Sequence, residues 1–344
     1  MTAAAAAARA ARRHFSSRLQ TTTSRLLHAN RFLIFSSPLC PIGDSQAAAR
    51  ETSGSFIHPA AVVHPDAAIG QVQCYREMKI LMKMLTIESK QGRGSVNKHL
   101  TFYVTRGGAI VGADIPGRTI IGENNVIGHY AVVGAKCQDL KYKTGDECFL
   151  HIGRNNEIRE YCSVHRSSKS CDCTVIGDNN LIMGSSHIAH DCKIGNNNIF
   201  ANNTLFAGHV IVEDWTHTAG AVVVHQFCHI GSYSFLGGGS VVAQDVPRYM
   251  MVAGDRAELR GLNIEGLRRN GFSDQEVRRL RKAYQRVFMP TITSKSSFED
   301  RLAELEQEVE LSESPAVSCM VESIRMSFVQ GHRGICKFRS WNSS

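Results

Sequence analysis

The stretch IGDNNLIMGSSHIAHDCKIGNNNIF, residues 176–200, carries an apolar residue at every sixth position. The series runs on to residue 242, and all its members but one are apolar: Ile176, Ile182, Ile188, Ile194, Phe200, Phe206, Val212, Thr218, Val224, Ile230, Leu236 and Val242. A period of six fits neither a helix nor a plain alternating strand. It fits short strands joined by tight corners, with one inward side chain on each face, and three faces close a triangular coil of about eighteen residues.

The same repeat covers most of the chain before residue 176. Ile152, Ile158 and Val164 hold the phase, a second block at 121–134 is shifted by one residue across the loop 135–151, and a third lies at 57–70. Asparagine pairs between the apolar positions suit corners that need a positive φ; they are Asn124-Asn125, Asn155-Asn156, Asn179-Asn180 and Asn202-Asn203. We therefore predict an all-β solenoid over residues 55–247.

One segment inside this range breaks the repeat. Residues 71–103 show helical spacing at Met78, Leu81, Met82 and Leu85 instead. A helical excursion from the solenoid fits this irregular segment, and so does an error in the derived sequence that replaces about two coils.

A helical domain is expected after the repeat ends at Pro247. Residues 248–272 form a connecting segment, and Ser273 with Glu276 predicts a capping box at the start of the domain 273–344. Three amphipathic helices are indicated by apolar residues at helical spacing: Val277, Leu280, Tyr284, Val287 and Phe288; Phe298, Leu302, Leu305 and Val309; Val317, Met320, Val321, Ile324 and Phe328. Covering the open end of the solenoid is the simplest role for them.

The N-terminal residues 1–43 have the composition of an organellar transit peptide. They hold six arginines, no lysine and no acid, and they are rich in alanine, serine and threonine. The arginines are spaced along a stretch capable of forming a helix, which favours the mitochondrion over the plastid. Residues 44–54 are read as a linker.

The remaining composition excludes several classes of protein. The leader carries six of the eight net positive charges, so the charge balance indicates no nucleic-acid partner. No run of 18 apolar residues predicts a transmembrane segment. The eleven cysteines are an odd number and are scattered, which favours reduced thiols over a disulfide framework. Cys171 and Cys173, without a second pair, are a weak metal signal.

Histidines cluster along the repeat. Seven of the fifteen lie between His165 and His229. In an eighteen-residue coil, His190 lies beside Gly208-His209 on the next rung and near His225-Gln226 on the one after, at a spacing of about 4.8 Å per rung. His165 and His187 fall on adjoining rungs. A single buried histidine is more often structural, but a row of them along one edge favours a functional site.

Several runs resemble the UDP-N-acetylglucosamine O-acyltransferases of lipid A synthesis, which are hexapeptide-repeat enzymes. The runs are CQDLKY (137–142), VHRS (164–167), SSHIAHDCKIGNNNIFANNTLFAGHV (185–210), VVHQFCHIG (223–231), VAQDVPRY (242–249) and LNIEGLRRNGF (262–272). The resemblance implies a left-handed parallel β-helix followed by a C-terminal α-helical domain. It also implies a homotrimer with active sites between subunits.

The resemblance further implies a reaction. The family moves a (3R)-hydroxyacyl chain from acyl carrier protein to the 3-hydroxyl of UDP-N-acetylglucosamine, the first step of lipid A biosynthesis. His190 matches the family's catalytic base, Asp191 the residue that orients it, and Gly208 the backbone N–H donor to the oxyanion. No metal and no cofactor are implied, because the donor substrate is the phosphopantetheine thioester of the carrier protein.

The family's substrate positions also have matches. Substrate-binding positions map to Asp139, Lys141, His165, His187, His209, His225, Gln226 and Arg269. Asn263 and Glu265 match residues that reach the nucleotide, and the acyl-chain ruler maps to Gly238 and Arg256. Asn270 and Arg256 depart from the family, which commonly has an arginine and a histidine there. The basic run from Arg268 to Arg286 could receive the acidic carrier protein, and a solvated helix face is the other interpretation.

Other functions are open. A γ-class carbonic anhydrase-like zinc enzyme would use His187, His190 or His209 as ligands. A catalytically inactive trimeric scaffold is also compatible with the repeat. Cys192 lacks the paired base that a cysteine nucleophile needs, and packing is its simplest role.

Overall fold

The computed structural model describes residues 56–57, 61–63, 67–69, 104–289, 296–308 and 314–338. The chain divides into two units, residues 1–48 and 49–344, and the described residues all belong to the second. The predicted leader 1–43, the linker 44–54 and the irregular segment 71–103 lie outside the described residues.

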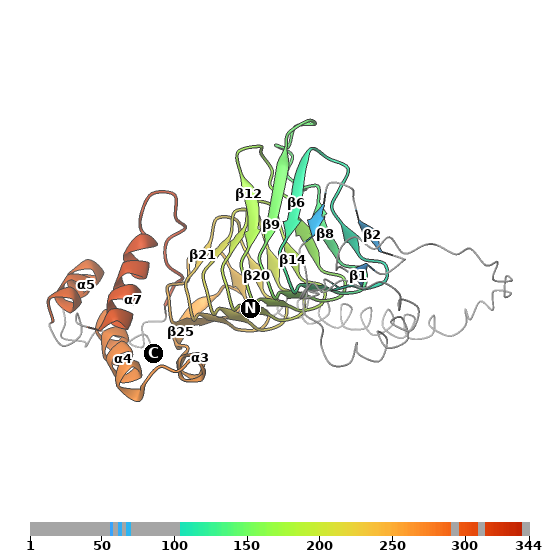
Figure 1. The fold of residues 1–344 in the computed structure, drawn as a ribbon. Helices are drawn as coiled ribbons and strands as arrows, with labels where there is room; N and C mark the ends of the chain where they lie inside the picture. The colour runs from blue at the N-terminus through green and yellow to red at the C-terminus, as the bar shows by residue number, and fades with distance from the viewer. Residues whose placement is uncertain are drawn as a thin grey trace, which may run out of the picture. The chain divides into compact units, whose positions relative to one another are not determined.

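The repeat folds into a left-handed parallel β-helix with three sheets, as the resemblance implied (Figure 1). The first sheet holds β1 (Phe56–Ile57), β4 (Val104–Thr105), β7 (Val126–Ile127), β10 (Glu157–Ile158), β13 (Leu181–Ile182), β16 (Ile199–Phe200), β19 (His217–Thr218), β22 (Phe235–Leu236), β24 (Met250–Ala253) and β25 (Glu258–Leu262). The second holds β2 (Val62–Val63), β5 (Ile110–Val111), β8 (Val132–Ala135), β11 (Ser163–His165), β14 (His187–Ile188), β17 (Leu205–Phe206), β20 (Val223–Val224) and β23 (Val241–Val242). The third holds β3 (Ala68–Ile69), β6 (Gly117–Ile121), β9 (Cys148–Ile152), β12 (Cys173–Ile176), β15 (Lys193–Ile194), β18 (Ile211–Val212) and β21 (His229–Ile230).

The strand register confirms the predicted eighteen-residue coil. Ile188 pairs with Phe206, and Phe206 with Val224, each eighteen residues further along the chain. These side chains are at most 1% exposed, so the sixth-position residues form the core of the prism. Before β14 the offsets are longer, since loops at 136–147 and 166–172 are inserted between rungs.

The two asparagines of each pair adopt different backbone conformations. Only one member of each pair has a positive φ, as at Asn179 (φ 59°). The other member of three pairs points inward: the Asn180 N–H donates to Asn156 Oδ1, and Asn180 Oδ1 accepts from the Asn198 N–H, both at 2.9 Å. The prediction of corner asparagines is therefore confirmed for one residue per pair. The inward residues instead form a buried hydrogen-bonded ladder that pairs backbone groups.

The last coil leads into the helical region. Residues 248–272 hold β24, the antiparallel β25 and helix α3 (Ile264–Arg269). The three predicted helices are present as α4 (Asp274–Phe288), α5 (Phe298–Gln307) and α7 (Pro315–Met326), and Ser273 with Glu276 forms the predicted capping box. Of the residues predicted in them, Val309 lies outside the described residues and Phe328 follows the end of α7. They pack on one another, and α4 also contacts β25. Among the described residues, no helix is long and apolar enough to cross a bilayer.

Candidate functional site

The candidate site begins at a corner of the coil. Between β14 and β15 the chain turns through His190 and Asp191, and Asp191 has a φ of 61°. Along a straight strand two neighbouring side chains point to opposite faces, but this left-handed corner turns them together. His190 Nδ1 lies 2.7 Å from Asp191 Oδ2, and the two residues are 5% and 2% exposed.

Asp191 is held in place from three sides. Its carboxylate accepts hydrogen bonds from the Ser168 N–H at 3.1 Å and from Ser168 Oγ at 2.6 Å, and its own N–H donates to Thr174 Oγ1 at 2.8 Å. Burial favours the protonated acid, but the hydrogen bonds from His190 and Ser168 outweigh it and lower the pKa of Asp191. An ionised carboxylate accepts only, so Nδ1 of His190 donates this hydrogen bond, and in the neutral imidazole Nε2 is then the nitrogen that can accept a proton.

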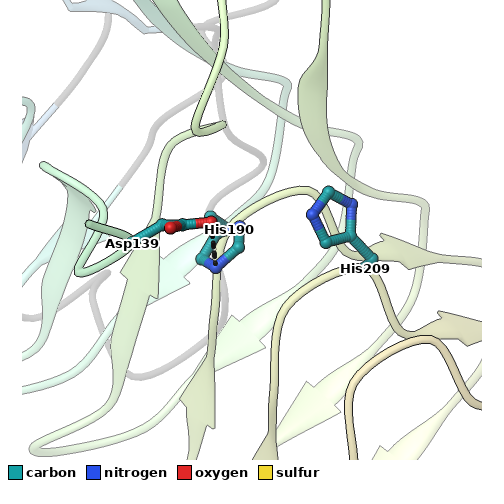
Figure 2. A group of neighbouring side chains, drawn as sticks. All are labelled: Asp139, His190 and His209. Carbon is teal, nitrogen blue, oxygen red and sulfur yellow. Dashed lines mark ion pairs between the residues drawn. The ribbon is translucent and has the colours of Figure 1, made fainter. Parts of the chain in front are cut away.

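The free nitrogen of His190 faces a cluster of polar groups. Figure 2 shows Asp139 and His209 on either side of the His190 ring. Asp139 Oδ2 is 3.7 Å from His190 Nε2, and the rings of His190 and His209 are 5.2 Å apart. Asp139 comes from the loop after β8, where its Oδ1 accepts the Lys141 N–H at 2.8 Å. The coil arithmetic that placed His190 beside Gly208-His209 is thus confirmed.

Gly208 makes room for the imidazole. A Cβ on this residue would lie 2.4 Å from His190 Cε1 and 2.6 Å from Nε2. His190, Gly208 and Gln226 occupy the same corner position on three successive coils. Among the described residues, the backbone N–H of each has no acceptor. At Gly208 that N–H belongs to the residue packed against the His190 ring.

Three further histidines extend the edge. His165 and His187 meet ring to ring at 4.8 Å, and Ser163 Oγ is hydrogen-bonded to His187 Nδ1 at 2.7 Å. Burial lowers the pKa of His165 to about 4, with smaller contributions from its histidine neighbours, and burial also lowers the pKa of His187. His209 stacks on Phe227 at 4.7 Å, and burial lowers its pKa more than Asp191 raises it. All three rings are therefore favoured in the neutral form.

Other residues expected at the site do not reach His190 in this chain. His225 and Gln226 are exposed on the next corner. Asn263 caps α3 and donates through Nδ2 to the Tyr233 carbonyl at 2.9 Å. The remaining four are Glu265 and Arg269, which pair with each other at 3.0 Å, and Gly238 and Arg256, which are exposed. Within the described residues, no hydrogen bond or ion pair joins any of these to His190.

Sequence reasoning missed the residues that support the pair. Ser168 and Thr174 fix Asp191, Ser163 holds His187, and Phe227 stacks on His209. Ser168 follows the run VHRS directly, but the loop that folds it back on Asp191 has no repeat to predict its path. Cys192, by contrast, is fully buried, and burial raises the pKa of its thiol to about 12, which supports packing as its role.

Two groups of side chains are spaced to hold a metal ion. The ligand atoms of Asp139, His190 and His209 lie within 4.8 Å of one another, as do those of Asp172, Asp191 and His209. His187, which the zinc alternative included, belongs to neither group.

Two family models match parts of this chain, and several known proteins are similar to it. Residues 245–336 match the model of the UDP-N-acetylglucosamine O-acyltransferase family, domain 2, and residues 173–208 match the bacterial transferase hexapeptide model. An Arabidopsis thaliana protein named "probable acyl-(acyl-carrier-protein)–UDP-N-acetylglucosamine O-acyltransferase, mitochondrial" is 62% identical over 237 residues, which cover 69% of this chain and 70% of the relative. A Pseudomonas syringae enzyme of the same name is 44% identical over 59% of this chain and 76% of its own length.

Solved structures are similar over most of the chain. The Arabidopsis UDP-N-acetylglucosamine acyltransferase aligns with a TM-score of 0.70 and 57% identity, over 82% of this chain and 100% of that one. The enzyme from Acinetobacter baumannii aligns with a TM-score of 0.59 and 35% identity, over 83% and 99%.

Proposed function

Because the chain belongs to the UDP-N-acetylglucosamine O-acyltransferase family, we propose that it transfers an acyl chain from acyl carrier protein to UDP-N-acetylglucosamine. The acyl group is a (3R)-hydroxyacyl chain and the acceptor is the 3-hydroxyl of the sugar, as the first step of lipid A biosynthesis. The observation that carries this proposal is the buried His190–Asp191 pair, whose free Nε2 faces Gly208 and Asp139.

The pair performs general-base catalysis. His190 Nε2 accepts the proton of the sugar hydroxyl as its oxygen attacks the thioester carbonyl carbon. The Asp191 carboxylate stabilises the imidazolium through the 2.7 Å contact to Nδ1. The Gly208 N–H, which has no acceptor among the described residues, donates to the oxyanion. When the C–S bond breaks, the imidazolium returns its proton to the phosphopantetheine sulfur.

The surrounding polar groups position the substrates. Asp139, Lys141, His165, His187, His209, His225 and Gln226 bind the sugar and the acyl chain in this proposal. Asn263, Glu265 and Arg269 reach the nucleotide from a neighbouring subunit of a homotrimer, which accounts for their lack of contact with His190 within one chain. Gly238 and Arg256 limit the acyl length, and no metal or other cofactor takes part.

We place the reaction in the mitochondrion. Two observations support this: the Arabidopsis relative is named as mitochondrial, and residues 1–43 are rich in arginine and free of acid. Fusion of residues 1–50 to a fluorescent protein should direct it to mitochondria. Plastid or cytosolic fluorescence would contradict the assignment.

The test of the proposed activity uses the purified full chain. Acyl carrier proteins loaded with 3-hydroxyacyl chains of graded length are incubated with UDP-N-acetylglucosamine, and the product is identified by mass spectrometry. We expect one chain length to be transferred fastest. Absence of the acylated sugar nucleotide at every length would overturn the proposal, in favour of a zinc-dependent hydratase if the zinc-loaded chain hydrates carbon dioxide, or of a scaffold if it does neither.

A further inference from the structure

The cluster around the free nitrogen of His190 has the chemistry of a transition-metal site. Asp139 offers a carboxylate oxygen and His190 and His209 offer ring nitrogens, and these atoms lie within 4.8 Å of one another. Ligand atoms about 2.0–2.2 Å from a zinc ion in a tetrahedral site stand somewhat over 3 Å apart. The 3.7 Å between Asp139 Oδ2 and His190 Nε2 is close to that value.

The His190 nitrogen is also prepared for a metal. Histidine ligands generally donate their second ring N–H to a carboxylate, which fixes the tautomer and raises the basicity of the ligating nitrogen. Asp191 does this for His190 at 2.7 Å. The hydrogen bond that makes Nε2 a proton acceptor therefore also makes it a metal ligand.

The other two ligands, Asp139 and His209, are partly exposed to solvent, and negative charge lies beside them. The side chains of Asp139 and His209 are 18% and 27% exposed, whereas that of His190 is 7% exposed. The Asp191 carboxylate, 3.5 Å from His209 Nε2, adds a second negative charge beside the cluster. Asp191 is already bonded to Ser168 and His190, so the first group is a better site than the Asp172 group.

We propose that Asp139, His190 and His209 form an inhibitory site for a divalent transition-metal ion of the zinc class. The bound ion occupies His190 Nε2, which then cannot accept the proton of the acceptor hydroxyl. The binding site stands on the geometry alone, and its inhibitory effect rests on the proposed acyltransferase function.

Direct binding tests the site independently of turnover. Zinc chloride is titrated calorimetrically into the full chain carrying Cys171→Ser and Cys173→Ser, which removes the exposed thiol and its half-buried neighbour. We expect one zinc ion per chain. Asp139→Asn and His209→Gln should each weaken binding at least about tenfold, while His129→Gln, which changes an exposed histidine outside the cluster, should not. Equal affinity in all four proteins would overturn the site.

Turnover then tests the inhibition. In the same chain with Cys171→Ser and Cys173→Ser, zinc should abolish acyl transfer at the concentration that fills the calorimetric site, and a chelator should restore it. Zinc binding at the cluster with undiminished transfer would overturn the inhibitory role. If the chain binds zinc at the cluster but never transfers an acyl group, the site stands and the proposed acyltransferase function fails.

Discussion

His190 and Asp191 are consecutive residues, yet they form the catalytic contact of the proposed mechanism. Their 2.7 Å hydrogen bond depends on the positive φ of Asp191 and on Ser168 and Thr174, which hold the carboxylate and its backbone N–H. The left-handed conformation of a non-glycine residue costs about 1 kcal/mol or more. The same conformation occurs at other corners of the coil, such as Asn197 and His209, so the fold itself turns Asp191 towards His190.

Replacing Asp191 with asparagine tests the orientation. The amide preserves the shape but carries no charge to stabilise an imidazolium, and its NH2 group could fix the wrong histidine tautomer. We expect kcat to fall by about 10²–10⁴ with a smaller change in KM. Steady-state kinetics would measure both constants, and circular dichroism would confirm the coil. An unchanged kcat would remove Asp191 from the mechanism.

Gly208→Ala tests the approach of the next rung to the base. The new Cβ would fall 2.4 Å from His190 Cε1, so the imidazole has to move away from the acceptor hydroxyl. A displacement of this kind should lower kcat by about 10²-fold. Gly220→Ala is the matched control, since the nearest atom to its Cβ is 3.6 Å away, and it should turn over normally. Equal rates for both variants would contradict the assigned role of Gly208.

At the scale of the elements, the sixfold repeat predicts the coil because each face of the coil contributes one apolar residue to the core. The inward residues from Ile176 to Val242 are buried as predicted. The strand register follows as well, because in an eighteen-residue coil each residue pairs with the one eighteen positions further along. Phase does not determine which asparagine of a corner pair turns inward; hydrogen bonding to the neighbouring rungs does.

The asparagine ladder should be a major contributor to stability. Asn180 lies in its middle, where its Oδ1 accepts the buried Asn198 N–H and its Nδ2 donates to the Gly195 carbonyl. Asn180→Ala leaves both backbone groups unpaired, at about 1–3 kcal/mol each. Asn202→Ala, at an exposed corner, should change the free energy of unfolding by less than about 0.5 kcal/mol. Chemical denaturation measures the two, and similar losses would refute the ladder's role.

The site was harder to predict from sequence than the coil. Stacking arithmetic placed His190 beside His209, and the structure agrees. The loops at 136–147 and 166–172 have no period, so no spacing argument could bring Asp139 to Nε2 or Ser168 to Asp191. The family resemblance predicted Asp139, whereas the role of Ser168 is seen only in the folded loop 166–172.

At the scale of the whole molecule, one chain brings together the proposed catalytic groups but not the complete proposed substrate site. Asn263 is used as the cap of α3, and Glu265 and Arg269 pair with each other. A trimer in which these residues face the His190 of a neighbour would complete the site, since a closed ring repeats one heterologous interface.

Mixed trimers test that arrangement. A His190→Ala chain and a chain with Glu265→Ala and Arg269→Ala should each be impaired alone. After co-expression in equal amounts, about a quarter of the intersubunit sites combine two intact halves. We expect the unfractionated co-expressed protein to recover about that fraction of the wild-type rate. Recovery no greater than the average of the two parents would mean that each site lies within one chain.

The most direct test of the central claim is the rate of acyl transfer to UDP-N-acetylglucosamine by the full chain and by His190→Ala, with a metal chelator present. We predict that the unmodified chain and the exposed-histidine control His129→Gln turn over alike, and that His190→Ala is slower by at least about 10²-fold. Full activity in His190→Ala would contradict the account.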